Sequence, residues 1–488
     1  MTRTISIDPI TRLEGHGKID IFLDDNGAVQ DTYFQIPELR GFERFVVGRP
    51  IEELPRIVTR ICGVCPASHH MASAKAVDGC FGNECPPLAH KLRDMYYHAH
   101  YIHSHIAHFY ALAAPDFVCG PDSDPAMRNI LGVVAKVGLE IGGAVIKARA
   151  QAQEIQKVIG GRFTHLVWCL PGGVSKGITK KELEEEIRPR VKELYDFTLF
   201  SIDLFKKVVL GNPAYVELIL KGPYNLQVQN MGLVDENNAP NFYDGKVRVV
   251  DCEGKELYKY SPEEYVQYVA EHVEPWSYLK FPYLKKRGWN GFEEGPNSSI
   301  YMATPLARLN VADRMATPKA QEKFEEMYKT LGKKPCQALM ASHWARLVEM
   351  VQNAEMLQRY CDDPEITGKN YRVVPKQITG EGVGIVEAMR GTLTHHYTCD
   401  KNGICTSANL IVGTTNNNAP IHMVTKKAAA AFIKPGVEPT QGILNMVEMA
   451  FRSFDPCYSC ATHSLPGQMP LHVRIYKEDE LRWEFKRP

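Results

Sequence analysis

Two Cys-x-x-Cys motifs near opposite ends of the chain constrain its fold more than any other feature. Each is followed by a histidine, and the six residues are Cys62, Cys65 and His69 in one motif and Cys457, Cys460 and His463 in the other. Thiolates are soft ligands, suited to zinc, copper(I), nickel and iron–sulfur chemistry. Because the pairs come from such distant segments, they predict a soft-metal site that forms only when the whole chain has folded.

Three kinds of site fit these cysteines. A structural zinc site uses four sulfurs, but zinc-binding pairs usually lie tens of residues apart, whereas most of this chain separates the two motifs. A redox pair of thioredoxin type fits Cys62 and Cys65, but no βαβ pattern surrounds them and the second pair is left unexplained. The third kind is a catalytic metal centre on four thiolates.

Composition excludes several classes of partner. The 488 residues include 57 basic and 57 acidic side chains, so the formal net charge is zero. This balance gives no reason to expect nucleic acid or an anionic membrane surface as a partner. The chain has 13 cysteines, an odd number scattered through its length. That is not the pattern of a disulfide-stapled secreted domain, so we expect the cysteines outside the two motifs to be reduced and mostly buried.

No segment is predicted to enter a membrane. Residues 1–10 lack the apolar core of a signal peptide. The most apolar long window, Ile130 to Ile146, is interrupted by Lys136 and Glu140 and is shorter than the roughly 20 residues of a spanning helix. We interpret it as a buried helix and expect a soluble, cytoplasmic protein.

The first half of the chain predicts a strand hairpin followed by long helices. Residues 19–23 and 28–34 flank a turn at Asn26-Gly27, a pair suited to tight hairpins. A helix is expected over 88–113. Another is expected from Asp124-Pro125 to Ile159, because an N-cap residue precedes Pro and Gly160-Gly161 follows.

The second half mixes strands and helices. Thr179 and Glu182 have capping-box spacing, and Pro189 should kink or interrupt the helix that they open. The further expected elements are strands over 246–260, helices over 318–360, a hairpin around 400–403, a helical run to Phe451 and a strand-like tail over 471–485. The predicted fold class is α+β, a central long-helix bundle with small peripheral sheets. No linker is evident, and the two motifs must meet, so the chain is not divided between them.

With their neighbours, the two motifs resemble those of the large subunit of [NiFe] hydrogenases. That family carries Arg-x-Cys-Gly-x-Cys-x-x-x-His and Asp-Pro-Cys-x-x-Cys-x-x-His, and both are complete here. The resemblance extends to residues 12–16, 40–43 and 387–391. It is strongest to the cytoplasmic branch, and within it to the methyl-viologen-reducing enzymes that feed heterodisulfide reductase, as residues 51–53, 276–282 and 391–397 suggest. The NAD-reducing bidirectional enzymes share much of the pattern.

The resemblance implies a nickel ion held by all four cysteines. Cys65 and Cys460 would bridge to an iron that carries CO and two cyanide ligands, and Cys62 and Cys457 would be terminal on nickel. The implied activity is reversible cleavage of H2 into two protons and two electrons. A terminal thiolate such as Cys457 would act as the base that takes the proton.

Other roles come from the same resemblance. Glu14 would relay protons between a terminal cysteine and the surface, and Arg390 with Asp455 would cover the open metal position. Many family members have Pro before this arginine, whereas this chain has Met389. Many also have Asp between two helix histidines, where this chain has Ser104.

A magnesium site and two contacts to the iron are also implied. Glu43 and His463, with the carbonyl of Leu410, would hold magnesium and tie down the C-terminal segment. His69 would orient groups beside the iron, and Thr414 would hydrogen-bond a cyanide. The histidines between 98 and 108 show no i, i+4 pair with a carboxylate, so we interpret them as core or interface residues.

The resemblance also predicts processing and partners. The family's mature subunit usually ends at the C-terminal histidine, so we expect a single domain over 1–463 and removal of residues 464–488 by a maturation protease after a nickel chaperone has acted. Iron–sulfur clusters must lie on a partner, an iron–sulfur small subunit, because no other cysteines show cluster spacing. Further electron-transfer subunits would be heterodisulfide-reductase-linked or an NAD/flavin module. The alternative class is a non-catalytic, zinc-stabilised scaffold subunit.

Overall fold

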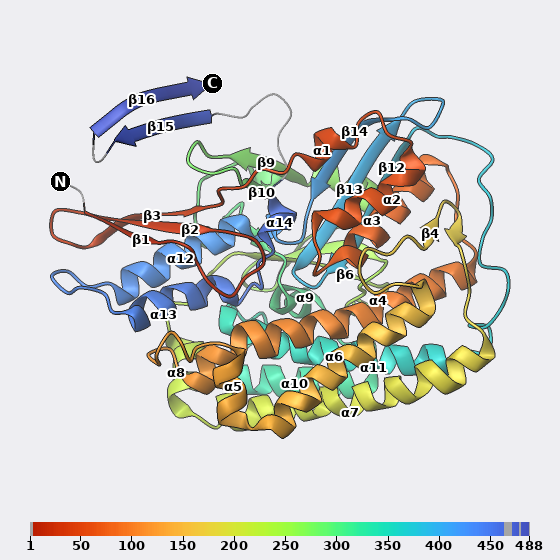
Figure 1. The fold of residues 1–488 in the computed structure, drawn as a ribbon, viewed down its shortest axis with the longest axis horizontal. Coiled ribbons are helices and arrows are strands. Elements are labelled where there is room, and N and C mark those ends of the chain that lie inside the picture. The colour runs from red at the N-terminus through yellow and green to blue at the C-terminus, as the bar shows by residue number, and fades with distance from the viewer. Residues whose placement is uncertain (1–2, 463–470, 478–479, 488) are drawn as a thin grey trace.

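The longest helices form a bundle across one half of the molecule (Figure 1). The structure is a computed structural model that describes residues 3–462, 471–477 and 480–487. The bundle helices are α4 (Pro87–Ala107), α6 (Leu139–Gly160), α7 (Arg188–Phe205) and α11 (Ser342–Asp362). Helix α4 packs against both α6 and α11, and α7 packs against α6 and α11. The expected helical core is therefore confirmed.

The other described helices are shorter. They are α1 (Phe42–Phe45), α2 (Leu54–Ile57), α3 (Pro66–Cys80), α5 (Ile130–Val137), α8 (Pro213–Lys221), α9 (Pro305–Val311), α10 (Pro318–Leu331), α12 (Asn418–Phe432), α13 (Gln441–Arg452) and α14 (Tyr458–Ala461). Helix α4 continues as the π-helical turns η3 (His108–Ala113) and η4 (Pro115–Cys119). None of the described helices combines the length and apolar character needed to cross a bilayer.

The strands form small separate sheets, as expected for the α+β class. The sheets are β1 (Thr4–Ile7), β2 (Lys18–Leu23) and β3 (Val29–Gln35); β11 (Tyr301–Met302), β6 (Gln229–Val234), β7 (Lys246–Val250) and β8 (Glu256–Tyr260); β12 (Glu381–Ala388), β13 (Gly391–Cys399) and β14 (Cys405–Ile411); and the pairs β9 (Val269–Val273) with β10 (Lys280–Leu284), β4 (Cys169–Leu170) with β5 (Gly173–Val174), and β15 (Leu471–Lys477) with β16 (Glu480–Arg487). The predicted hairpins β2–β3 and β13–β14 are confirmed, and the strands expected over 246–260 are β7 and β8.

Glycines bring α3 directly onto β12. A side chain at Gly382 or Gly384 would meet the carbonyl oxygens of Ala76 and Ala72 at 2.0 and 1.9 Å. The backbone of the strand therefore lies against the helix without side chains between them. This contact fixes the end of β12 relative to α3, which begins at Pro66, directly after Cys65.

The helix predicted over 124–159 is wrong in its start and its continuity. Helix α5 begins after Asn129, whose side chain caps it, and Gly138 (φ 92°) separates α5 from α6. The apolar window is also not buried, since Leu139 and Ile146 are 83% and 69% exposed. Apolar composition misleads this prediction because it carries no information about which face a helix turns to its neighbours.

The helix histidines are core residues, as expected. All five of those between residues 98 and 108 are buried. Each reaches a partner on another element: the pairs are His98–Asn353, His100–Gln156, His103–Gln153, His105–Glu349 and His108 with the Arg452 carbonyl. These bonds tie α4 to α6 and α11, and they tie η3, which begins at His108, to α13. The capping box of Thr179 and Glu182 is likewise present.

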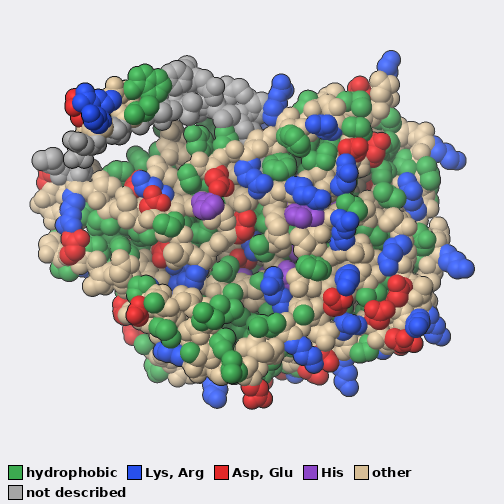
Figure 2. Space-filling view, in the orientation of Figure 1, with side chains coloured by type: hydrophobic (Ala, Val, Ile, Leu, Met, Phe, Trp, Pro, Cys, Tyr) green, Lys and Arg blue, Asp and Glu red, His purple; other side chains and the backbone are tan. Residues whose placement is uncertain are grey.

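Charge on the surface is mixed. Figure 2 shows Lys and Arg side chains interspersed with Asp and Glu over the visible face, in keeping with zero net charge. Strands β15 and β16 pair with each other as a hairpin at the edge of the molecule (Figure 1). The predicted strand-like tail is confirmed within the described part of this segment.

Candidate metal centre

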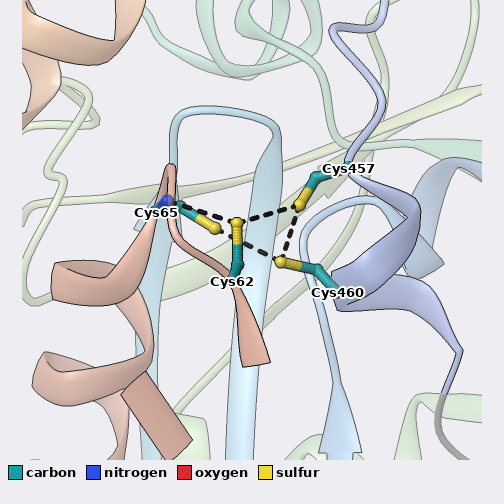
Figure 3. Close-up of side chains that lie close together, drawn as sticks. All are labelled: Cys62, Cys65, Cys457 and Cys460. Atoms are coloured by element: carbon teal, nitrogen blue, oxygen red, sulfur yellow. Dashed lines mark hydrogen bonds between the residues drawn. The ribbon is translucent and has the colours of Figure 1, made fainter. Parts of the chain in front are cut away.

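The four motif cysteines meet in the interior. Their sulfur atoms lie within 4.8 Å of one another, all four residues are buried, and all are free thiols. Cys62 Sγ is 3.3 Å from Cys457 Sγ, and Cys65 Sγ is 3.3 Å from Cys460 Sγ. Figure 3 shows the four side chains pointing toward one another from the two motifs. The predicted convergence of the two ends of the chain is confirmed.

Local backbone structure aims the sulfurs inward. Cys62 follows the 3-10 turn η2 (Val58–Ile61), and its Sγ accepts hydrogen bonds from the N–H groups of Val64 and Cys65. In the second motif, Cys457 precedes α14, and its N–H donates to Thr414 Oγ1 at 2.9 Å. Thr414 thus fixes the backbone of a cysteine, and its predicted bond to a cyanide stays a prediction.

The thiols differ in acidity. Hydrogen bonding with Cys457, Cys460 and Cys65 holds the pKa of Cys62 well below its ordinary value. Burial raises the pKa of Cys457 and of Cys460 well above the ordinary value. The directions of these shifts favour ionisation of Cys62 over that of Cys457 and Cys460.

The donor set fits a soft metal ion. Sulfur ligands at about 2.3 Å from one ion lie at most about 4.6 Å apart, close to the 4.8 Å within which these four atoms fall. Four buried sulfurs with no disulfide between them suit nickel, iron or zinc.

Glu14 lies between the cysteines and the surface. The Cys457 thiol donates to Glu14 Oε2 at 3.0 Å, and the Ser459 N–H donates to the same atom at 3.1 Å. A short parallel bridge joins the backbones of Glu14 and Cys457. Glu14 is half-buried, so its carboxylate joins a buried thiol to a more exposed region.

Arg390 and Asp455 form a buried ion pair. Arg390 Nη2 lies 3.1 Å from Asp455 Oδ2. Burial alone would lower the pKa of Arg390, but Asp455 and the thiols of Cys457 and Cys65 raise it well above the ordinary value. Burial raises the pKa of Asp455 to about 6, against the opposing effect of Arg390. Nε and Nη1 of Arg390 have no hydrogen-bond partner among the described residues, so this guanidinium keeps donors for a ligand.

His69 reaches the second motif. Its Nε2 lies 3.3 Å from Cys460 Sγ, and its Nδ1 shares a hydrogen bond with His395 Nε2 at 3.1 Å. Burial lowers the pKa of His69 to about 4, so the ring is neutral near pH 7. The bond to His395 holds this ring in one orientation against the sulfur.

The predicted magnesium ligands are only partly described. Glu43 Oε1 accepts a hydrogen bond from the Leu410 N–H at 2.9 Å, and the Lys280 ammonium lies 3.1 Å from it. Burial raises the pKa of Glu43 to about 7, against the opposing charge of Lys280. His463 lies outside the described residues. The Leu410 carbonyl as a ligand stays a prediction.

A buried charge network was not predicted from the sequence. Asp116 accepts from Arg12 and from Arg452, the latter at 3.2 Å to both carboxylate oxygens. Asn445 and Glu448 complete the network through Arg452 at 2.8 and 2.7 Å. It fastens the segment before Glu14 to α13, which precedes Cys457. Its members are distant in sequence, so no local signal could have shown it.

Comparison with known proteins identifies the family. A family model described as nickel-dependent hydrogenase matches residues 40–122 and 215–463, more than half of the chain. The chain belongs to the nickel-dependent hydrogenase family. A second model, described as HoxL-like, matches residues 4–39.

Relatives cover almost the whole chain. The iron-sulfur subunit of the F420-non-reducing hydrogenase of Archaeoglobus profundus is 48% identical, over 98% of each chain. The corresponding F420-non-reducing hydrogenase subunit of Methanothermobacter marburgensis is 42% identical, over 96% of each chain. A crystal structure of NAD+-reducing [NiFe]-hydrogenase in the H2-reduced state is 38% identical with a TM-score of 0.88, over 95% of this chain and all of the other.

These matches confirm the hydrogenase expectation, the fold class and the branch. The F420-non-reducing relatives are more similar in sequence than the NAD+-reducing structure. The family also supports nickel, with iron, as the metal of the four-cysteine cluster. Both F420-non-reducing relatives are named as subunits of a hydrogenase.

Proposed function

We propose that the chain is the catalytic subunit that cleaves and forms H2 and passes the electrons to an iron–sulfur small subunit. From there the electrons would reach a soluble cytoplasmic acceptor system of heterodisulfide reductase or ferredoxin type. The observation that carries the proposal is the buried four-sulfur cluster with Glu14 bonded to Cys457 at 3.0 Å. A structural zinc site has no need of a proton acceptor beside one of its sulfurs.

The cysteines would hold two metals. Nickel would take all four sulfurs, and Cys65 and Cys460 would be shared with an iron that carries CO and two cyanides. When bound, this group supplies the Lewis acid and redox centre at which H2 splits heterolytically. The neutral imidazole of His69 would keep the Cys460 sulfur in place, and Thr414 would hold the backbone of Cys457.

The chain's own residues would move the proton. Cys457 Sγ is the first acceptor, and Glu14 Oε2 takes the proton from it across the 3.0 Å bond. Arg390, held by Asp455, would direct its unpaired donors at the open metal position. Burial of Cys457, Arg390 and Asp455 excludes water, which strengthens the electrostatic contacts among them.

Infrared spectroscopy of the complex, purified anaerobically from its host, tests this proposal. One CO band and two cyanide bands are expected where protein does not absorb. Their absence from a folded complex that lacks residues 464–488 would exclude the nickel–iron assignment and favour zinc. Mass spectrometry of the same sample tests the proposed cleavage after His463, which a full-length mass in active enzyme would contradict.

A second candidate acceptor is NAD+, which the similarity to an NAD+-reducing enzyme favours. H2 uptake by the complex should reduce low-potential viologen or ferredoxin faster than NAD+ if the first assignment holds. A magnesium site at Glu43, Leu410 and His463 is also proposed. It predicts magnesium in the purified complex and its loss in Glu43→Gln.

A further inference from the structure

Arg308, on α9, is fully buried and uses every donor it has. Its Nε and Nη2 donate to the two carboxylate oxygens of Glu349 at 2.7 and 2.9 Å, and Nη1 donates to Glu387 Oε2 at 3.2 Å. Nη1 and Nη2 also donate to the backbone carbonyls of Ala388 and Met389 at 3.0 and 3.1 Å. A guanidinium has five N–H groups, and here five acceptors receive them.

The two carbonyls belong to the residues directly before Arg390. Met389 and Arg390 form the two-residue turn between β12 and β13, since Ala388 pairs with Gly391. On the other side of this turn, the Arg390 carbonyl accepts from Asn417 Nδ2 at 2.7 Å. Arg308 and Asn417 therefore hold the backbone of Arg390 from both sides.

The acids that orient Arg308 are themselves fixed. Glu349 Oε2 bonds His105 Nε2 at 2.9 Å, and Glu387 Oε1 accepts from the Leu233 N–H at 2.7 Å and from Thr392 Oγ1 at 2.8 Å. The guanidinium is thus locked by α4, α11 and two sheets. It has no freedom to rotate away from the turn.

We propose that Arg308 is a positioning residue for Arg390. Glu349 orients the guanidinium, and the guanidinium fixes the backbone before Arg390 by donating to the Ala388 and Met389 carbonyls. This inference rests on the proposed function, in which Arg390 faces the metal centre. Lysine at position 308 keeps the charge but offers a single ammonium instead of a planar fork, so it cannot serve both the carboxylate and the two carbonyls.

A double-mutant cycle on the assembled enzyme tests the inference. Arg308→Lys alone is expected to lower kcat per bound nickel about tenfold, whereas the same change in an Arg390→Lys background lowers it by less than about twofold. Arg93→Lys is the matched control. Arg93 is also a buried arginine that binds an acid and two carbonyls, those of Leu170 and Gly173, and its variant should leave kcat per bound nickel unchanged.

Equal losses for Arg308→Lys in both backgrounds would overturn the inference, because a purely structural residue acts independently of Arg390. If Arg308→Lys assembles poorly, Glu349→Gln, which keeps the side-chain size, takes its place in the double-mutant cycle with Arg390→Lys. It should show the same dependence on Arg390.

Hydrogen–deuterium exchange of the metal-free full-length chain separates this inference from the proposed function. Arg308→Lys should speed exchange in peptides that cover 384–393, and Arg93→Lys should not. If the wild-type complex fails to oxidise H2, the proposed function fails while the exchange result still decides whether Arg308 holds the turn. Unchanged exchange in Arg308→Lys would remove the positioning role.

Discussion

The Glu14 carboxylate accepts a hydrogen bond from the Cys457 thiol at 3.0 Å, although the two residues stand at opposite ends of the chain. Their backbones are joined as well, because the Tyr458 N–H donates to the Glu14 carbonyl at 2.9 Å. This main-chain hydrogen bond fixes the backbone of Glu14 beside Cys457. The Glu14 carboxylate therefore stays close to the sulfur.

Glu14→Gln should keep the bond from the Ser459 N–H but lose the ability to carry a proton. We expect H2 oxidation with viologen to fall at least about 100-fold. Interconversion of H2 spin isomers needs no proton to leave the site and should persist. Glu38→Gln, at a partly exposed glutamate paired with His16, is the control. Full activity in Glu14→Gln would remove Glu14 from the proton path.

Gly15 allows the close approach of the two ends. Its φ is +89°, and a Cβ there would meet the Ser459 nitrogen at 3.0 Å and Tyr458 Cβ at 3.1 Å. Gly15→Ala should therefore push Glu14 away from Cys457 and lower both nickel content and activity.

Gly48→Ala separates this clash from backbone strain alone. Gly48 also has a positive φ (+84°), but nothing lies within 4 Å of its Cβ position. Both variants carry the strain of about 1–2 kcal/mol for alanine in this region, and only Gly15→Ala carries the clash. Equal melting temperatures and nickel contents would contradict the argument.

Local chemistry explains which parts of the fold are predictable. The Asn26-Gly27 turn and the capping box at Thr179 depend on residues a few positions apart, and both are present. The four cysteines can be identified as metal ligands because paired Cys-x-x-Cys motifs have few other uses. The break between α5 and α6 is missed because Gly138 lies inside an apolar window.

Long-range pairing explains what the sequence does not show. Nothing near Arg308 or Asp116 marks either residue, since charged side chains in helical segments are usually solvated. Their roles depend on partners that only the folded chain supplies, such as Glu349 for Arg308 and Arg452 for Asp116. The predicted pair of Arg390 and Asp455 comes from resemblance to a family and not from spacing.

Asp116→Asn should destabilise the protein strongly. The carboxylate lies between the guanidinium groups of Arg12 and Arg452, and all three side chains are buried or nearly so. Removing its charge leaves Arg12 without its carboxylate partner and Arg452 with Glu448 alone, at a cost of about 3–5 kcal/mol in the free energy of unfolding. Denaturant titration measures this loss.

Glu438→Gln is the control for Asp116→Asn. Glu438 pairs with Arg3 on the surface, where both side chains are more than half exposed, so little stability should be lost. A similar small effect for Asp116→Asn would show that the buried network does not hold the N-terminal segment to α13.

Nickel uptake by the metal-free chain should strengthen as pH rises. Burial raises the pKa of Cys457 and Cys460 well above the ordinary thiol value, so both carry protons near pH 7 and must lose them when a metal binds. Each displaced proton changes the apparent Kd about tenfold per pH unit, with tighter binding on the alkaline side.

Calorimetric titration with Ni²⁺ between about pH 6.5 and 8.5, in buffers of different ionisation enthalpy, counts the protons released. Cys457→Ser should release fewer protons and bind more weakly. Cys252→Ser, at a buried cysteine outside the cluster, should match the wild type. An affinity independent of pH would mean that the thiols are already ionised, and that the hydrogen bonds of the cluster outweigh its burial.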